Sequence, residues 1–257
     1  MARGPQRRPP VRATARTAMP TVADLLQTGL AHHKSNRLKP AERAYRKALD
    51  AEPNNADALH LLGVVVLAGG DAGEAVSLIE RAAERAPRRP AILFHLGEAY
   101  RTAGRMEDAL AAFKNTVEIA PDDTEALFNM GLILTHLGRA GEAVPIFIKA
   151  STLAPGSPEL KLALGIALKD IGDLEEAERI YRDLLSATPD FAEAHANLGI
   201  VLQMQKRRDE ALDSFRKALA LRPEFFRQAV QNISATGAGQ LWLSLEQARK
   251  ALGQDSG

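Results

Sequence analysis

Glycine, proline and alanine recur along this sequence with one shared period of 34 residues. The glycine series is Gly29, Gly63, Gly97, Gly131, Gly165 and Gly199. The proline series is Pro53, Pro87, Pro121, Pro155, Pro189 and Pro223, and the alanine series is Ala41, Ala75, Ala109, Ala143, Ala177 and Ala211. Three residue types that keep one period through six copies, without an insertion, indicate a repeat architecture.

Each period has the pattern of two helices joined by a short turn. Apolar residues stand at helical spacing on both sides of the repeated glycine, in the third copy as Leu93, Leu96, Tyr100, Ala109 and Phe113. Further glycines mark the turn in four copies, at Gly70, Gly104, Gly138 and Gly172. The repeated glycine and alanine are small because the second helix must cross close over the first. The repeated proline ends the second helix, since it lacks an N–H and clashes with a continuing helix.

These features resemble the tetratricopeptide-repeat family, whose period is 34 residues. Counted from Val22, the copies are 22–55, 56–89, 90–123, 124–157, 158–191 and 192–225. Position 24 is large and apolar in every copy, as Tyr45, Ile79, Phe113, Phe147, Tyr181 and Phe215. Position 4 is leucine in the first four copies but Lys161 and His195 in the last two. The resemblance implies an all-α fold, a right-handed α-solenoid of six helix-turn-helix repeats over residues 22–225.

The two ends of the chain lack the repeat. Residues 1–21 contain five arginines, several prolines and no acid, which is typical of a disordered basic tail. In residues 226–257, apolar residues again follow helical spacing, first around Phe226 and Val230 and then around Leu241 and Leu245. We expect residues 226–257 to form a helical pair that caps the last apolar face of the stack.

Composition and motifs give no support to catalysis. The chain has no cysteine, so a thiolate metal site, a disulfide and a cysteine nucleophile are excluded. No two of the six histidines have the spacing of metal ligands. The glycine-rich segment 69–73 is not preceded by a predicted strand or followed by Gly-Lys-Ser/Thr, so it does not match a phosphate-binding loop. The longest apolar run, Leu61 to Ala68, is too short to span a bilayer. We therefore expect a non-enzymatic cytoplasmic protein with no cofactor, no metal, no transmembrane segment and no clear nucleic-acid partner.

The family resemblance implies a concave groove, lined by the first helix of each repeat, that receives an extended peptide or a partner helix. The residues that the resemblance assigns to peptide binding are Leu26, His60, Phe94, Glu98, Arg101, Glu125, Phe128, Asn129, Leu132, Glu159, Leu162, Ile166, Lys169, Glu193, Asn197 and Ile200. At positions 5 and 9 of the repeats, ten of the twelve residues are apolar, and position 2 of four repeats is acidic (Asp57, Glu125, Glu159 and Glu193). This pattern favours a protein segment with apolar anchors and some basic residues.

Two readings of the apolar groove stay open, because its aliphatic residues could equally serve packing between repeats. For Phe94 and Phe128 the ligand role is favoured, since aromatic anchors commonly dominate binding. We expect Phe128 to face the groove and not the interface between the two helices of its repeat.

Two specialisations of the family can be compared with this sequence. The carboxylate clamp of chaperone-binding members is absent, because Leu26, Leu30 and Leu61 occupy positions that the clamp fills with lysine and asparagine. The asparagine ladder of O-linked sugar transferases is reduced to Asn129 and Asn197. The favoured function is a peptide-binding scaffold or adaptor. The alternatives are a self-assembling structural protein and a substrate-docking subunit of a separately encoded transferase.

Overall fold

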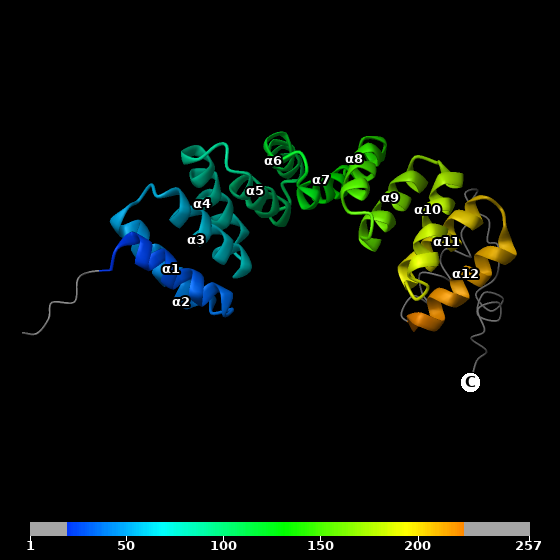
Figure 1. Cartoon of the computed structure of the whole chain (residues 1–257), viewed down its shortest axis with the longest axis horizontal. Helices are drawn as coiled ribbons and strands as arrows, with labels where there is room; N and C mark the ends of the chain where they lie inside the picture. The colour runs from blue at the N-terminus through cyan, green and yellow to red at the C-terminus, as the bar shows by residue number, and fades with distance from the viewer. Residues whose placement is uncertain (1–19, 224–257) are drawn as a thin grey trace, which may run out of the picture. The chain divides into compact units, whose positions relative to one another are not determined.

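The computed structural model describes residues 20–223, and this part of the chain is all helical (Figure 1). The predicted capping helices at 226–257, and residues 1–19 of the predicted tail, lie outside the described residues. The helices are α1 (Val22–Lys34), α2 (Leu38–Ala51), α3 (Ala56–Ala68), α4 (Ala72–Arg85), α5 (Pro90–Thr102), α6 (Met106–Ile119), α7 (Thr124–His136), α8 (Ala140–Leu153), α9 (Pro158–Asp170), α10 (Leu174–Ala187), α11 (Ala192–Met204) and α12 (Arg208–Leu221). The prediction of an all-α solenoid of helix pairs is confirmed.

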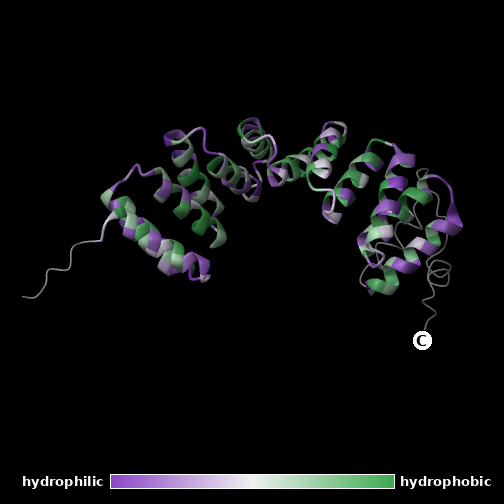
Figure 2. Ribbon diagram, viewed as in Figure 1, coloured by the Kyte–Doolittle hydropathy of each residue, from purple (hydrophilic) through white to green (hydrophobic). Residues whose placement is uncertain are grey.

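The chain divides into two compact units, Met1–Arg85 and Ala86–Gly257. In the first unit α1 packs on α2 and α3 packs on α4, and α2 also contacts α3. In the second unit the pairs α5–α6, α7–α8, α9–α10 and α11–α12 stack in the same way. The contacts between successive pairs are α6 with α7, α8 with α9 and α10 with α11. Figure 2 shows hydrophobic and hydrophilic residues alternating along the helices, the pattern that lets one side of each helix pack and the other meet solvent.

The contact between the two helices of each pair is made by the repeated glycine and the large residue at position 24. A Cβ built on Gly131 would lie 2.5 Å from Cε1 of Phe147, and one on Gly165 would lie 2.5 Å from Cε1 of Tyr181. The same relation holds in the other four pairs, which join Gly29 to Tyr45, Gly63 to Ile79, Gly97 to Phe113 and Gly199 to Phe215. Glycine is therefore required because the neighbouring side chain occupies the space of a Cβ.

Polar side chains cap the N-termini of several helices, and a residue with positive φ lies in the turn between the two helices of each pair. Asn55, Asp123 and Ser157 each accept a hydrogen bond from the backbone N–H three residues later, which caps α3, α7 and α9. The four predicted turn glycines all have positive φ, between 74° and 95°. In the other two pairs the equivalent turn residues are Asn36, with φ 54°, and Lys206, with φ 65°.

Ion pairs join the last two helix pairs of the second unit. Arg207, the residue before α12, donates from Nη1 to both carboxylate oxygens of Glu178 on α10, at 2.7 Å. Arg182 lies 2.8 Å from the same carboxylate, of which the side chain is only 11% exposed. Burial raises the pKa of Glu178, but the hydrogen bonds and the two arginine charges outweigh it and hold the pKa below the ordinary 4.5.

None of the helices in residues 20–223 combines the length and the apolar character that a membrane crossing requires.

Candidate functional site

Fourteen of the sixteen predicted groove residues lie in the second unit, and the other two lie in the first. Leu26 on α1 is half-buried, whereas His60 on α3 is 7% exposed. Little of the His60 side chain is therefore open to a ligand. These two residues belong to the first unit, whereas the other fourteen lie on α5, α7, α9 and α11 of the second.

Two adjoining hollows lie between α7 and α9. The first has a volume of about 260 Å³ and is lined by Phe128, Leu132, Thr135, Phe147, Glu159, Leu162, Ala163 and Ile166. The second has a volume of about 360 Å³ and is lined by Thr124, Glu125, Phe128, Ala154, Ser157, Glu159 and Leu160. Phe128 and Glu159 line both hollows, which we together call the α7–α9 trough. Six predicted residues therefore meet in this trough.

Phe128 has two roles in the structure, and one of them was not expected. Its half-buried ring lines the trough, but it also packs on the buried ring of Phe147, with centroids 6.2 Å apart and ring planes at 58°. The expectation that Phe128 avoids the interface between the two helices of its repeat was wrong. The large ring at position 24, Phe147, also lines the hollow, and Phe128 packs against it. Phe94 behaves alike, with its ring 5.6 Å from that of Phe113 and nearly edge-on, and it lines neither hollow.

Fewer of the acidic residues at position 2 border the trough than the sequence pattern predicted. Glu125 and Glu159 are exposed beside the trough, and Glu159 accepts a hydrogen bond of 2.9 Å from the Ser157 hydroxyl. Glu193, by contrast, forms an ion pair with Arg222. The carboxylates that border the trough are therefore Glu125 and Glu159.

The remaining predicted residues lie outside the trough. Asn129 and Asn197 each donate their side-chain amide to the backbone carbonyl one turn earlier, at 3.0 and 2.9 Å, which leaves the amide oxygen as an acceptor. Lys169 forms an ion pair with its neighbour Asp170. Glu98 and Ile200 are half-buried and Arg101 is exposed, and none of the three lines either hollow.

The trough also contains residues that sequence reasoning did not assign to it. Phe147 and Ala163 come from the packed interior, and Ala154 and Ser157 come from the connection between α8 and α9. Thr135 is at position 12 of its repeat, which faces the groove in the family, so this position could have identified it from the sequence. No sequence signal indicates that Phe147 forms the base of a hollow.

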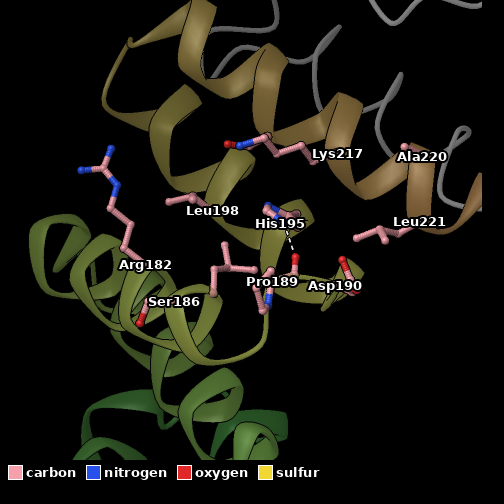
Figure 3. A pocket seen from close by; sticks show the side chains of 11 residues that line it. Arg182, Ser186, Pro189, Asp190, His195, Leu198, Lys217, Ala220 and Leu221 are labelled. Atoms are coloured by element: carbon pink, nitrogen blue, oxygen red, sulfur yellow. Dashed lines mark hydrogen bonds between the residues drawn. The ribbon is translucent and has the colours of Figure 1, made fainter.

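A larger cavity lies among α10, α11 and α12, away from the trough (Figure 3). Its volume is about 610 Å³, and it is lined by Arg182, Leu185, Ser186, Pro189, Asp190, His195, Leu198, Ser214, Lys217, Ala220 and Leu221. His195 is 8% exposed, and its Nε2 lies 2.8 Å from the carbonyl oxygen of Pro189, the contact drawn as a dashed line. The sequence showed His195 as a departure at position 4 but assigned no site to it.

Within residues 20–223, no group of three or more acidic or histidine side chains is arranged to hold a metal ion. The described residues offer two apolar hollows bordered by two carboxylates, and one cavity with mixed polar and apolar walls.

Models of the tetratricopeptide repeat match residues 26–90, 66–130, 134–201 and 192–225. No curated protein matches the chain.

Solved structures of similar fold come from several proteins. A tetratricopeptide repeat protein from Parabacteroides merdae ATCC 43184 has a TM-score of 0.66 at 21% identity, covering 91% of this chain and 98% of that one. PilF of Pseudomonas aeruginosa has a TM-score of 0.64 at 22% identity, covering 79% and 92%. YrrB, described as a repeat protein with an unusual peptide-binding site, has a TM-score of 0.63 at 20% identity, covering 70% and 93%. At these identities the likeness shows a shared fold.

Proposed function

The chain belongs to the tetratricopeptide-repeat family, and we propose that it is a non-enzymatic scaffold whose α7–α9 trough binds a segment of a protein partner. The repeat fold is in general a scaffold for interactions between proteins, and it is typically non-catalytic.

The observation that carries the proposal is the pair of hollows on either side of Phe128. Leu132, Leu162 and Ile166 give the first hollow an almost wholly apolar wall. Leu132 is 40% exposed although it is large and apolar, and it lies where a ligand could cover it. A segment that places one apolar side chain in each hollow would bury both, and each burial is worth about 1.5–3 kcal/mol.

The carboxylates of Glu125 and Glu159 define the second feature of the ligand. Both are exposed at the trough, and Glu159 borders both hollows. A lysine or arginine between or beside the two apolar anchors would meet them, which would orient the segment and speed association more than it would raise affinity. An acidic C-terminal peptide of the chaperone type would meet like charges here and would bind poorly.

The fold has a precedent for peptide binding. YrrB is described as having an unusual peptide-binding site, and its structure covers 70% of this chain. This likeness supports a peptide as the class of ligand, while the choice of trough and anchors comes from the residues of this chain.

A display library of random twelve-residue peptides tests the proposal. Peptides selected on the intact chain are compared for binding to Leu132→Gln, which places an amide in the first hollow. Ile148→Gln on α8 is the matched control, because Ile148 is also exposed and apolar, at 50%, but lines neither hollow. We expect selected peptides to carry two spaced apolar residues and a lysine or arginine, and to bind Leu132→Gln about tenfold or more weakly while binding Ile148→Gln normally.

The charge requirement is tested separately with Glu159→Gln. We expect this variant to slow association of the basic peptides, and we expect the effect to shrink as salt rises through the physiological range. Selection of acid-rich peptides, or equal binding by wild type and Leu132→Gln, would overturn the proposal.

A further inference from the structure

Two neighbouring helix pairs differ at equivalent positions beside the cavity among α10, α11 and α12. In the fifth repeat, Lys161 on α9 forms an ion pair with Asp183 on α10. One period later the equivalent residues are His195 on α11 and Lys217 on α12. Two basic side chains cannot form the pair that Lys161 and Asp183 form, and these two residues line an open cavity of about 610 Å³.

His195 is buried and is held by a hydrogen bond, whereas Lys217 is exposed. The carbonyl oxygen of Pro189 can only accept, so the Nε2 of His195 at 2.8 Å carries a hydrogen and holds the ring in place. Within the described part of the chain, Lys217 is exposed and forms no hydrogen bond or ion pair with another residue.

The other walls define the rest of the site. Arg182 already pairs with Glu178 and Glu210, so it is a weaker candidate for a ligand. Leu185, Leu198 and Leu221 supply apolar surface. Figure 3 shows Asp190 next to Pro189 on one wall of the cavity and Lys217 of α12 on another. An anion in the cavity would be repelled by Asp190 and attracted by Lys217.

We propose that this cavity is a second binding site, which takes the carboxylate of an acidic residue in a protein partner together with an adjacent apolar side chain. The carboxylate would stand beside Lys217 and so supply the charge that Asp183 supplies beside Lys161 in the preceding repeat. The apolar neighbour would cover the leucines. This site prefers an acidic segment, whereas the trough prefers a basic one, and it does not depend on the function of the trough.

Nuclear magnetic resonance of the full chain with ¹³C-labelled histidine rings tests the proposal. The probes are acetyl-Leu-Glu-Leu-amide, its Gln counterpart and sodium acetate. We expect the Glu peptide to shift the His195 ring signals to saturation, and the Gln peptide to bind at least tenfold more weakly. Acetate at the same concentrations should leave the signals nearly unchanged, because it lacks the apolar neighbours.

Two variants of Lys217 and one control complete the test. Lys217→Gln should weaken binding of the Glu peptide about tenfold, whereas Lys149→Gln, at the same repeat position on α8, should not alter it. Lys217→Asp places a carboxylate on the wall of the cavity and should abolish binding while the circular dichroism spectrum stays unchanged. Equal binding of the Glu and Gln peptides, an acetate effect as strong as the peptide effect, or undiminished binding by Lys217→Asp would each reject the site.

Discussion

The ring of Phe147 lies against Gly131, so that a Cβ on Gly131 would stand 2.5 Å from Cε1 and 2.6 Å from Cζ of the ring. Phe147 is fully buried and cannot turn into solvent, and it also supports Phe128 at the base of the trough. The packing of the helix pair and the shape of the candidate site therefore depend on the same ring.

We expect Gly131→Ala to lower the free energy of unfolding by about 1–3 kcal/mol, because the added methyl group overpacks the interface. Gly141→Ala on α8 is the control, since a Cβ there meets nothing within 4 Å. That change should raise stability by about 0.5–1 kcal/mol, the usual gain of alanine over glycine in a helix. Urea unfolding followed by circular dichroism measures both. Equal effects of the two substitutions would contradict the assigned contact.

Phe128→Ala should lower stability as well as weaken ligand binding. The half-buried ring loses its contact with Phe147, which predicts a cost of about 1–2 kcal/mol from burial and aromatic packing. Ile148→Ala, at a residue that is 50% exposed, should change stability by less than about 0.5 kcal/mol. Thermal and urea unfolding distinguish these outcomes, and an unchanged stability of Phe128→Ala would mean that its ring packs only against a ligand.

Tyr181→Phe should stabilise the protein. The Tyr181 hydroxyl is buried without a hydrogen-bond partner among the described residues, and burial raises the pKa of this phenol above its ordinary 10. Three other repeats carry phenylalanine at this position, so the ring alone satisfies the packing. Removing an unsatisfied buried hydroxyl is worth about 1–3 kcal/mol. A loss of stability in the urea midpoint would show that the hydroxyl has a partner.

Glu178→Gln should reveal a pH-dependent contribution of the Glu178–Arg207 pair. Because the pKa of Glu178 is lowered in the folded state, its contribution is fully present above the unfolded value near 4.5 and disappears as pH falls through the folded pKa. At pH 7 we expect the variant to be less stable by about 1.5–3 kcal/mol, the range for hydrogen bonds to charged groups. The difference from wild type should shrink progressively below about pH 5. Glu175→Gln, at an exposed residue of the same helix, should show no such trend.

Lys206→Gly should raise stability by about 0.5–1 kcal/mol, because lysine at φ 65° is in the left-handed region that glycine adopts without strain. Gly172 occupies the equivalent turn one repeat earlier with φ 85°. Ala103→Gly, at a residue with φ −77°, is the control and should lower stability. If both glycine substitutions destabilise, the turn at Lys206 does not hold the left-handed conformation.

The period alone was enough to predict the helix pairs and their contacts. Each copy carries a glycine and a large residue sixteen positions later, and helical geometry brings these two together with few alternatives. The turn glycines were equally predictable, because their positive φ is a local property of the backbone. Such features depend on residues that are close in sequence, and for that reason they can be read without a structure.

The site depended on tertiary contacts that the repeat positions do not reveal. Glu193 resembles Glu125 and Glu159 by position, yet it pairs with Arg222, which is 29 residues away. Phe128 was placed on the groove by its position, but its packing on Phe147 follows from side-chain orientation. The cavity beside His195 is lined by side chains from three helices and from the connection between two of them. Charge pairing and open volume are settled by which side chains meet across helices, so they appear only when the helices are packed.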